Sequence, residues 1–150
     1  MSPATQNEGH EKRSGPTVLL DARVIDCPGF YGVARHAREM VKRLPGLQPE
    51  WNWVTLLYGS PEEDRRDSVR TIVRPIPVDR YCAEQAAFQD LNTGLKPDLV
   101  HSFWYSTGEA FSCQRLLTVY DLIAFMPFDE VWTAERVLPL EWYRRSWQAA

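Results

Sequence analysis

Residues 17–44 read TVLLDARVIDCPGFYGVARHAREMVKRL, and this stretch decides the fold. Its first six residues form a nearly continuous apolar run, which is typical of a strand covered on both faces. A glycine-containing loop follows, and over 33–44 the apolar residues recur every three or four positions, as in an amphipathic helix. We expect Pro45 and Gly46 to end that helix, because proline cannot continue it and glycine accepts a left-handed turn. The stretch therefore predicts a strand, a turn and a helix in succession.

The rest of the chain repeats this alternation of strands and helices. Strands are predicted at 52–58, 69–76, 97–102 and 115–120, and helices at 81–91 and 133–150. Strands separated by helical stretches imply parallel pairing with right-handed crossovers. We therefore expect an α/β fold, a Rossmann-like open and mostly parallel sheet with helices on both faces. Residues 1–16 are predicted to form a flexible leader, and residues 17–150 one partial domain that is incomplete at its C-terminus.

Composition excludes several classes of protein. The net charge is −3 and no basic stripe with interleaved aromatic residues occurs, so nucleic acid is not expected as a partner. The three cysteines are widely spaced, which favours neither a disulfide framework nor a zinc site. No apolar run is long enough for a transmembrane segment, and the leader lacks the apolar centre of a signal peptide. We expect a cytoplasmic protein, with peripheral contact to the inner membrane left open.

Three predicted strand ends carry polar or aromatic side chains, at 21–23, 101–105 and 120–122. In an open parallel sheet the carboxyl ends of the strands share one edge, and ligands bind outside that edge. The sequence therefore predicts a binding site there.

The loop before the first helix holds two glycines, Gly29 and Gly32. Such glycines allow a ligand close to the backbone, and Arg23 and Arg35 could add charge-assisted bonds to its phosphate or carboxylate. The spacing is not GxGxxG, so no dinucleotide fingerprint is present. A tight turn whose glycines serve only geometry explains the loop equally well.

The other candidate residues are aromatic or ionisable. Tyr31 and Trp104 could stack on the faces of sugar rings, although composition alone favours aromatic residues that cap the core or meet another domain. His101 ends a buried strand, where a histidine is more often a hydrogen-bonded structural residue than a base. Asp121 leaves an apolar strand and needs a partner, either a ligand hydroxyl or a backbone group.

Four segments together resemble one known family. They are 21–23 (DAR), 29–35 (GFYGVAR), 96–102 (KPDLVHS) and 118–122 (TVYDL). Their order resembles that of the retaining GT-B glycosyltransferases of family 4, in the acceptor-side N-terminal half. The resemblance covers residues 18–145, nearly all of the chain after the leader.

The resemblance implies transfer of a sugar from a nucleotide-sugar donor to a glycan or lipid-linked acceptor, with retention at the anomeric carbon. It implies that Tyr120 and Asp121 lie on a catalytic His-Asp-Leu motif, with tyrosine in place of the histidine. Arg23, Gly29, Tyr31, Gly32, Arg35, His101 and Trp104 would then bind substrate. No metal and no cofactor other than the donor substrate is implied. The donor-binding half is not recognised in this chain, so we expect the chain alone to be inactive and a second domain or chain to supply it.

Two alternatives remain at this point. The chain could be a non-catalytic sugar-binding module or a partner subunit, because the predicted helix at 133–150 carries large apolar residues typical of an interface. An unrelated flavodoxin-like domain ranks last, because no convincing phosphate loop follows the first strand directly.

Overall fold

The computed structural model describes residues 15–27, 29–59, 70–74, 81–104, 109–120 and 148. For residues 81–83 it describes the backbone only. The predicted leader, apart from its last two residues, lies outside this part of the chain. So do Asp121, nearly all of the predicted helix at 133–150 and both ends of the predicted strand at 69–76.

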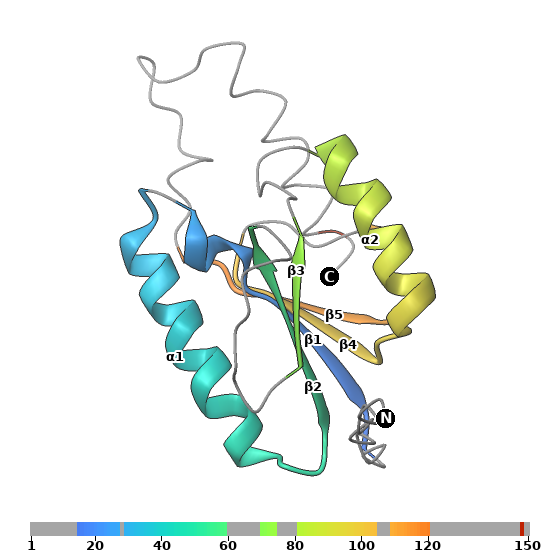
Figure 1. Cartoon of the computed structure of the whole chain (residues 1–150), viewed down its shortest axis with the longest axis horizontal. Coiled ribbons are helices and arrows are strands. Elements are labelled where there is room, and N and C mark those ends of the chain that lie inside the picture. Colours follow the sequence, from blue (N-terminus) through green and yellow to red (C-terminus); the bar gives the residue numbers. More distant parts are fainter. Residues whose placement is uncertain are drawn as a thin grey trace, which may run out of the picture.

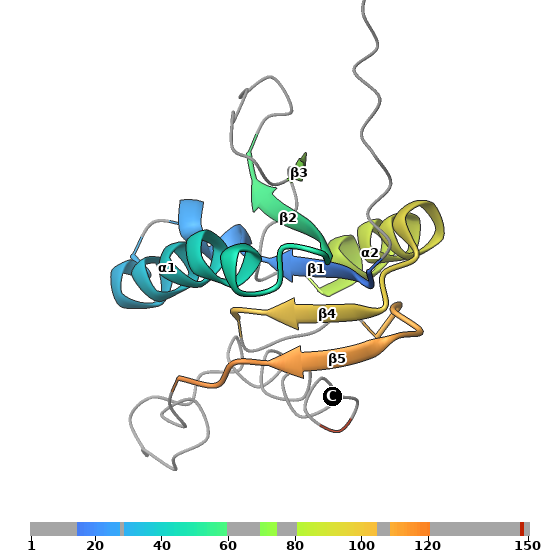
Figure 2. The same ribbon diagram turned by 90° about the horizontal axis from the view of Figure 1, so that it is seen from below.

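Five strands form one open sheet in which every pairing is parallel. In chain order they are β1 (Thr17–Asp21), β2 (Asn52–Tyr58), β3 (Arg70–Arg74), β4 (Leu99–Ser102) and β5 (Gln114–Leu117). Their order across the sheet is β3-β2-β1-β4-β5, which matches the first five strands of the 3-2-1-4-5-6 order of a Rossmann fold (Figure 2). The predicted α/β, Rossmann-like class is therefore confirmed.

Two helices cover the two faces of the sheet, with α1 (Tyr31–Leu47) on one side and α2 (Tyr81–Leu95) on the other (Figure 1). Successive residues of β1 enter different cores, because side chains alternate across a strand. Leu20 packs in the cluster that holds Ala37 of α1, whereas Leu19 packs in the cluster that holds Phe88 of α2. Neither helix, nor any other helix in the described residues, is long and apolar enough to cross a membrane.

The first helix does not end where the sequence predicts. Pro45 lies inside α1, which continues to Leu47, and Gly46 does not adopt a positive φ. The prediction that Pro45 and Gly46 end the helix is therefore wrong. Proline's fixed φ is compatible with a helix, and in the last turn its missing N–H costs a single bond. The turn after α1 is held by two hydrogen bonds to the Gln48 carbonyl. This carbonyl accepts from the Trp53 indole N–H at 2.8 Å and from the Trp51 backbone N–H at 3.2 Å.

Other boundaries also shift. Helix α2 runs past the predicted end at residue 91 to Leu95, and Lys96, at φ 49°, makes the left-handed turn that ends it. Strand β5 begins one residue before the predicted start and ends at Leu117, so Thr118 to Tyr120 leave the sheet edge as a loop. This loop reaches the neighbourhood of α1, which matters for the site.

Candidate functional site

The strand order reverses between β1 and β4, where connections leave toward opposite sides of the sheet. Such a switch point is where open α/β sheets bind ligands. Asp21 and Ser102 are register partners at its carboxyl end. The loops after β1, β4 and β5 all leave from this edge because the strands are parallel, as the sequence predicts.

A buried ion cluster lies at the carboxyl end of β1. Arg23, in a 3-10 turn (Arg23–Asp26), donates from Nε and Nη2 to the two carboxylate oxygens of Asp21, both at 2.7 Å. Its Nη1 lies 2.9 Å from Oε1 of Glu84 on α2. The guanidinium also lies over the ring of Phe88, 4.7 Å from its centroid. Burial alone would lower the pKa of Arg23, but the charges and hydrogen bonds of Asp21 and Glu84 outweigh it and raise that pKa above its ordinary value.

The cluster gives Arg23 an internal role. Its side chain is 0% exposed and ties the turn after β1 to helix α2. These contacts lend no support to Arg23 as a phosphate-binding residue, because its guanidinium already serves two carboxylates of the fold.

The two glycines of the predicted loop differ in what they require. Gly29 has φ +90°, a conformation that side-chain-bearing residues rarely adopt, so the turn itself explains this glycine. Gly32 lies within the first turn of α1 and has no positive φ, and no atom of the described residues would lie within 4 Å of a Cβ built on it. Neither a positive φ nor a close neighbour among the described residues therefore requires glycine at this position.

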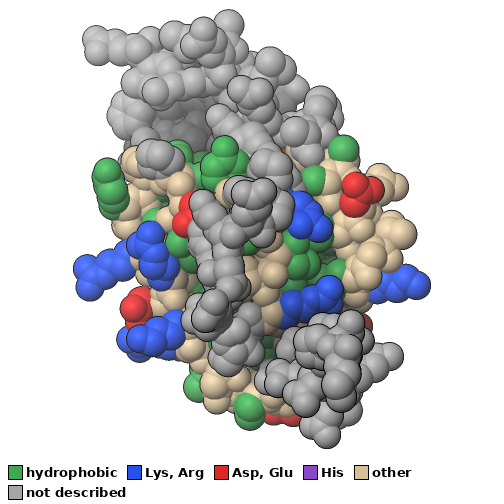
Figure 3. Space-filling model, in the orientation of Figure 1, with side chains coloured by type: hydrophobic (Ala, Val, Ile, Leu, Met, Phe, Trp, Pro, Cys, Tyr) green, Lys and Arg blue, Asp and Glu red, His purple; other side chains and the backbone are tan. Residues whose placement is uncertain are grey.

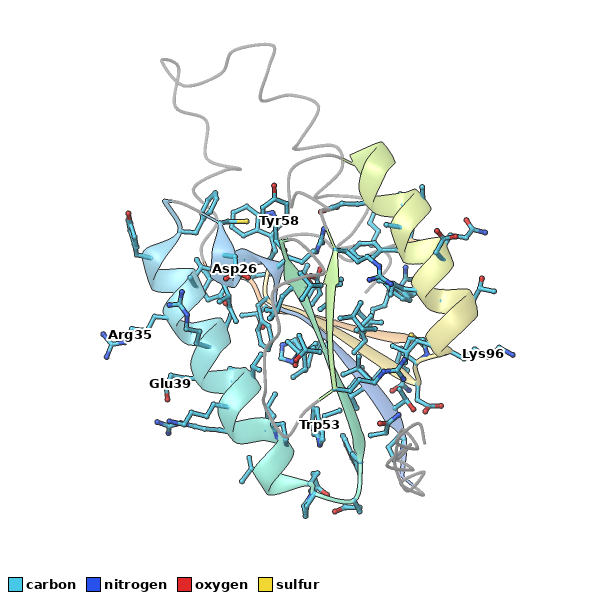
Figure 4. The ribbon with its side chains drawn as sticks, viewed as in Figure 1. Asp26, Arg35, Glu39, Trp53, Tyr58 and Lys96 are labelled. Carbon is cyan, nitrogen blue, oxygen red and sulfur yellow. The ribbon has the colours of Figure 1, made fainter. Side chains whose placement is uncertain are left out.

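Two other predicted residues, Tyr31 and Arg35, lie one helical turn apart on α1. The Tyr31 side chain is 83% exposed, and Arg35 is exposed and points away from the sheet (Figure 4). Lys and Arg side chains gather along this outer side of α1 (Figure 3). Tyr31 thus offers an accessible aromatic ring, and Arg35 an accessible charge.

Trp104 behaves differently. It is buried after β4, and its ring meets Phe30 edge to face at 4.5 Å between centroids. This geometry matches the core-capping alternative more closely than an open stacking platform.

His101 is also mostly enclosed, at 7% exposure. Its Nε2 lies 2.8 Å from the Thr118 hydroxyl, and its ring lies 4.3 Å from that of Phe103. Burial, and then the nearby charge of His36, lower its pKa from 6.5 to about 4. His101 is therefore a neutral, hydrogen-bonded imidazole near neutral pH.

The loop after β5 brings Tyr120 to helix α1. The Tyr120 hydroxyl lies 3.0 Å from Nδ1 of His36, and the two rings meet edge to face at 5.5 Å between centroids. His36 is exposed and lies in the second turn of α1. Sequence reasoning missed it, because its partner Tyr120 lies 84 residues away along the chain. Of the predicted catalytic pair, only Tyr120 is among the described residues.

Among the residues that the structure describes, no group of three or more His, Cys, Asp or Glu side chains could hold a metal ion. Comparisons with known proteins identify no relative: no family model, curated protein or solved structure matches the chain. The case for a function rests on the residues themselves.

Proposed function

We propose that this chain is the acceptor-side part of a retaining glycosyltransferase, which moves a sugar from a nucleotide-sugar donor to a glycan or lipid-linked acceptor. A further domain or second chain would bind the donor, and the reaction would take place in the cytoplasm, at the inner membrane if the acceptor is a lipid. The observation that carries the proposal is the hydrogen bond between His36 and Tyr120. It joins the helix of the GFYGVAR segment to the TVYDL segment, the two segments most central to the resemblance.

The chemistry at this edge suits an uncharged, hydroxyl-rich ligand. An imidazole and a phenol both exchange hydrogen bonds with hydroxyl groups. Tyr31 adds an exposed ring at the start of the same helix. Aromatic rings bind sugars through the apolar face of the pyranose, so the exposed ring of Tyr31 supports contact with an acceptor glycan.

The proposal is tested by binding to an array of immobilised glycans, with Tyr31→Ala and Leu47→Ala as a matched pair. Both residues are exposed apolar side chains of α1, at 83% and 71% exposure, but they lie at opposite ends of the helix. We expect the wild-type chain and Leu47→Ala to bind the same glycans and Tyr31→Ala to lose most of that binding. Failure of the wild-type chain to bind any glycan would contradict the proposal.

Turnover is tested separately, by incubating the chain alone with UDP-glucose or GDP-mannose and the best array glycan. We expect no release of nucleotide beyond the rate without protein. A steady release that depends on the glycan would show that the chain is active by itself and would overturn the assignment of donor binding to another domain. The alternative of a non-catalytic sugar-binding module predicts that no added donor domain restores transfer.

A further inference from the structure

Helix α1 differs in charge from the rest of the chain. It carries four cations, Arg35, Arg38, Lys42 and Arg43, and one acid, Glu39, which gives a net charge of +3 with histidine counted as neutral. The whole chain has a net charge of −3, so the residues outside α1 together carry −6. A basic amphipathic helix within an otherwise acidic chain indicates a local surface for an anionic partner.

Three of these cations form a row along the exposed side of the helix. Arg35, Arg38 and Lys42 follow one another at spacings of three and four residues, which places them on one side of α1. All three are exposed, whereas Ala37 is buried in the core beneath the helix. Arg35 points away from the sheet (Figure 4), and Lys and Arg side chains gather along this outer side of α1 (Figure 3). We call these three residues the cationic row, which spans about 10 Å of helix.

The charges of the row are not neutralised within the part of the chain that the structure describes. The acid of the helix, Glu39, forms its ion pair with Arg43, at 2.8 Å. Arg35 and Lys42 make no hydrogen bond or ion pair among the described residues, and Arg38 donates to a neutral backbone carbonyl at 3.0 Å. Like charges four residues apart, such as Arg38 and Lys42, destabilise a helix. A partner that supplies negative charge would relieve this cost.

The composition and shape of the row favour a lipid surface over a protein partner. The centre of a protein interface is depleted of charged residues, whereas the row consists of charged residues alone. Long, flexible cations on a convex helix suit a flat layer of mobile anionic headgroups. Each Lys or Arg near such a surface strengthens binding about fivefold.

Tyr31 favours a bilayer over a nucleic acid. Its side chain is 83% exposed, and it lies one helical turn before Arg35, at one end of the row. Tyrosine is enriched at membrane–water interfaces, at the level of the headgroups. Proteins that bind single-stranded nucleic acids instead combine a basic groove with aromatic rings on which successive bases stack. Residues 35–42 contain no Phe, Tyr or Trp, so the row matches the first arrangement.

We propose that the cationic row binds anionic phospholipid headgroups, with α1 lying along the membrane surface and Tyr31 at headgroup level. The contact is reversible, because three cations together strengthen binding only about 100-fold, and salt weakens it by screening. The proposal goes beyond the proposed function, because it requires neither a sugar nor a transfer reaction.

Sedimentation with lipid vesicles tests the row. The probes are vesicles of phosphatidylcholine alone and vesicles of phosphatidylcholine mixed with phosphatidylglycerol, neither of which carries a glycan. Lys42→Gln and Lys96→Gln are the matched pair, because both remove one charge from an exposed lysine, but Lys96 follows α2 on the other side of the sheet (Figure 4). Arg35→Gln combined with Lys42→Gln removes two charges of the row. Glutamine is a good helix former, so thermal unfolding should show that all variants fold.

We expect the wild type to sediment with the mixed vesicles but not with phosphatidylcholine, and high salt to release it. Lys42→Gln should bind about fivefold more weakly and the double variant about 20-fold, whereas Lys96→Gln should bind as the wild type does. Equal losses for Lys42→Gln and Lys96→Gln would show that overall charge acts alone, and would overturn the row as a docking surface. Absence of binding to the mixed vesicles, or equal binding to both kinds of vesicle, would overturn it as well.

A DNA duplex is the competing polyanion. If it binds the wild type more tightly than the mixed vesicles do, and Lys42→Gln weakens that binding, the row is a nucleic-acid surface and the lipid proposal is overturned. Binding to the glycan array is a separate measurement. Its failure contradicts the proposed function alone, and failure with the vesicles contradicts the docking surface alone.

Discussion

Arg23 and Asp21 face each other through two parallel hydrogen bonds of 2.7 Å, with both side chains almost completely shielded from solvent. Asp21 is the last residue of β1, and Arg23 opens the 3-10 turn that follows. The bidentate pair therefore fixes how the chain leaves the sheet before it reaches Gly29 and helix α1. Glu84 of α2 places a second carboxylate on the same guanidinium.

Replacing Arg23 should be strongly destabilising. Arg23→Met keeps an apolar stem of similar length but leaves Asp21 and Glu84 buried beside each other without their shared cation. Breaking a buried ion pair from one side costs about 3–5 kcal/mol of unfolding free energy. Arg23→Lys keeps the charge but cannot reproduce the planar two-bond contact, so we expect an intermediate loss. Urea denaturation measures both variants.

Arg35→Met is the control, because Arg35 is exposed on α1. It should change the unfolding free energy by less than about 0.5 kcal/mol. A loss for Arg23→Met no larger than this would show that the buried cluster contributes little to stability.

Much of the fold can be predicted from sequence because both faces of this sheet are covered. Continuous apolar runs such as 52–58 then mark strands directly, and β2 has the predicted bounds. Strand β5 was placed less accurately, since its exposed and half-buried residues alternate at the edge of the described sheet. Edge strands carry a weaker apolar signal, so their ends are poorly defined by sequence alone.

The site was less predictable, for two physical reasons. The His36 to Tyr120 contact spans 84 residues, so it depends on how the loop after β5 returns to α1, which no local pattern encodes. The burial of Arg23 runs against the usual exposure of arginine and depends on Glu84, which lies on a separate helix. The role of each polar residue therefore depends on partners that lie far away in the sequence. The spacing of residues along the chain indicates only where the polar residues gather.

Stability should rise with pH between about 4 and 6.5 because of His101. Its pKa is lowered from 6.5 to about 4, first by burial and then by the charge of His36. In this window the unfolded chain binds a proton at His101 that the folded chain does not, so acid favours unfolding. The full effect, reached below pH 4, is on the order of 3 kcal/mol.

Urea denaturation at a series of pH values from 4 to 7.5 measures this slope, with His101→Gln as the comparison. We expect the variant to have a lower stability at pH 7 but a flatter dependence through the window. Parallel curves for the two proteins would mean that His101 does not carry the pH dependence.

Gly29→Ala should destabilise the fold by about 1–2 kcal/mol, because alanine at φ +90° is strained by its Cβ. No described atom lies within 4 Å of the added methyl, so the cost would come from backbone conformation rather than from a clash. Thermal unfolding measures the change, and Gly46→Ala, near the end of α1, is the matched substitution without a positive φ. Equal midpoints for the two variants would show that the turn relaxes to a conformation open to any residue.

The contact between Arg23 and Phe88 should make a measurable contribution of its own. The guanidinium lies 4.7 Å from the centroid of this buried ring, and a desolvated cation–π contact is worth about 0.5–2 kcal/mol. A double-mutant cycle of Arg23→Met and Phe88→Leu, measured by urea denaturation, should therefore show a coupling energy in that range. Phe111→Leu is the control partner, since the Phe111 ring packs on Phe88, at 5.1 Å between centroids. The double-mutant cycle of Arg23→Met with Phe111→Leu should be additive to within about 0.5 kcal/mol. If the coupling energy between Arg23 and Phe88 is no larger than that, Phe88 contributes to stability by packing alone.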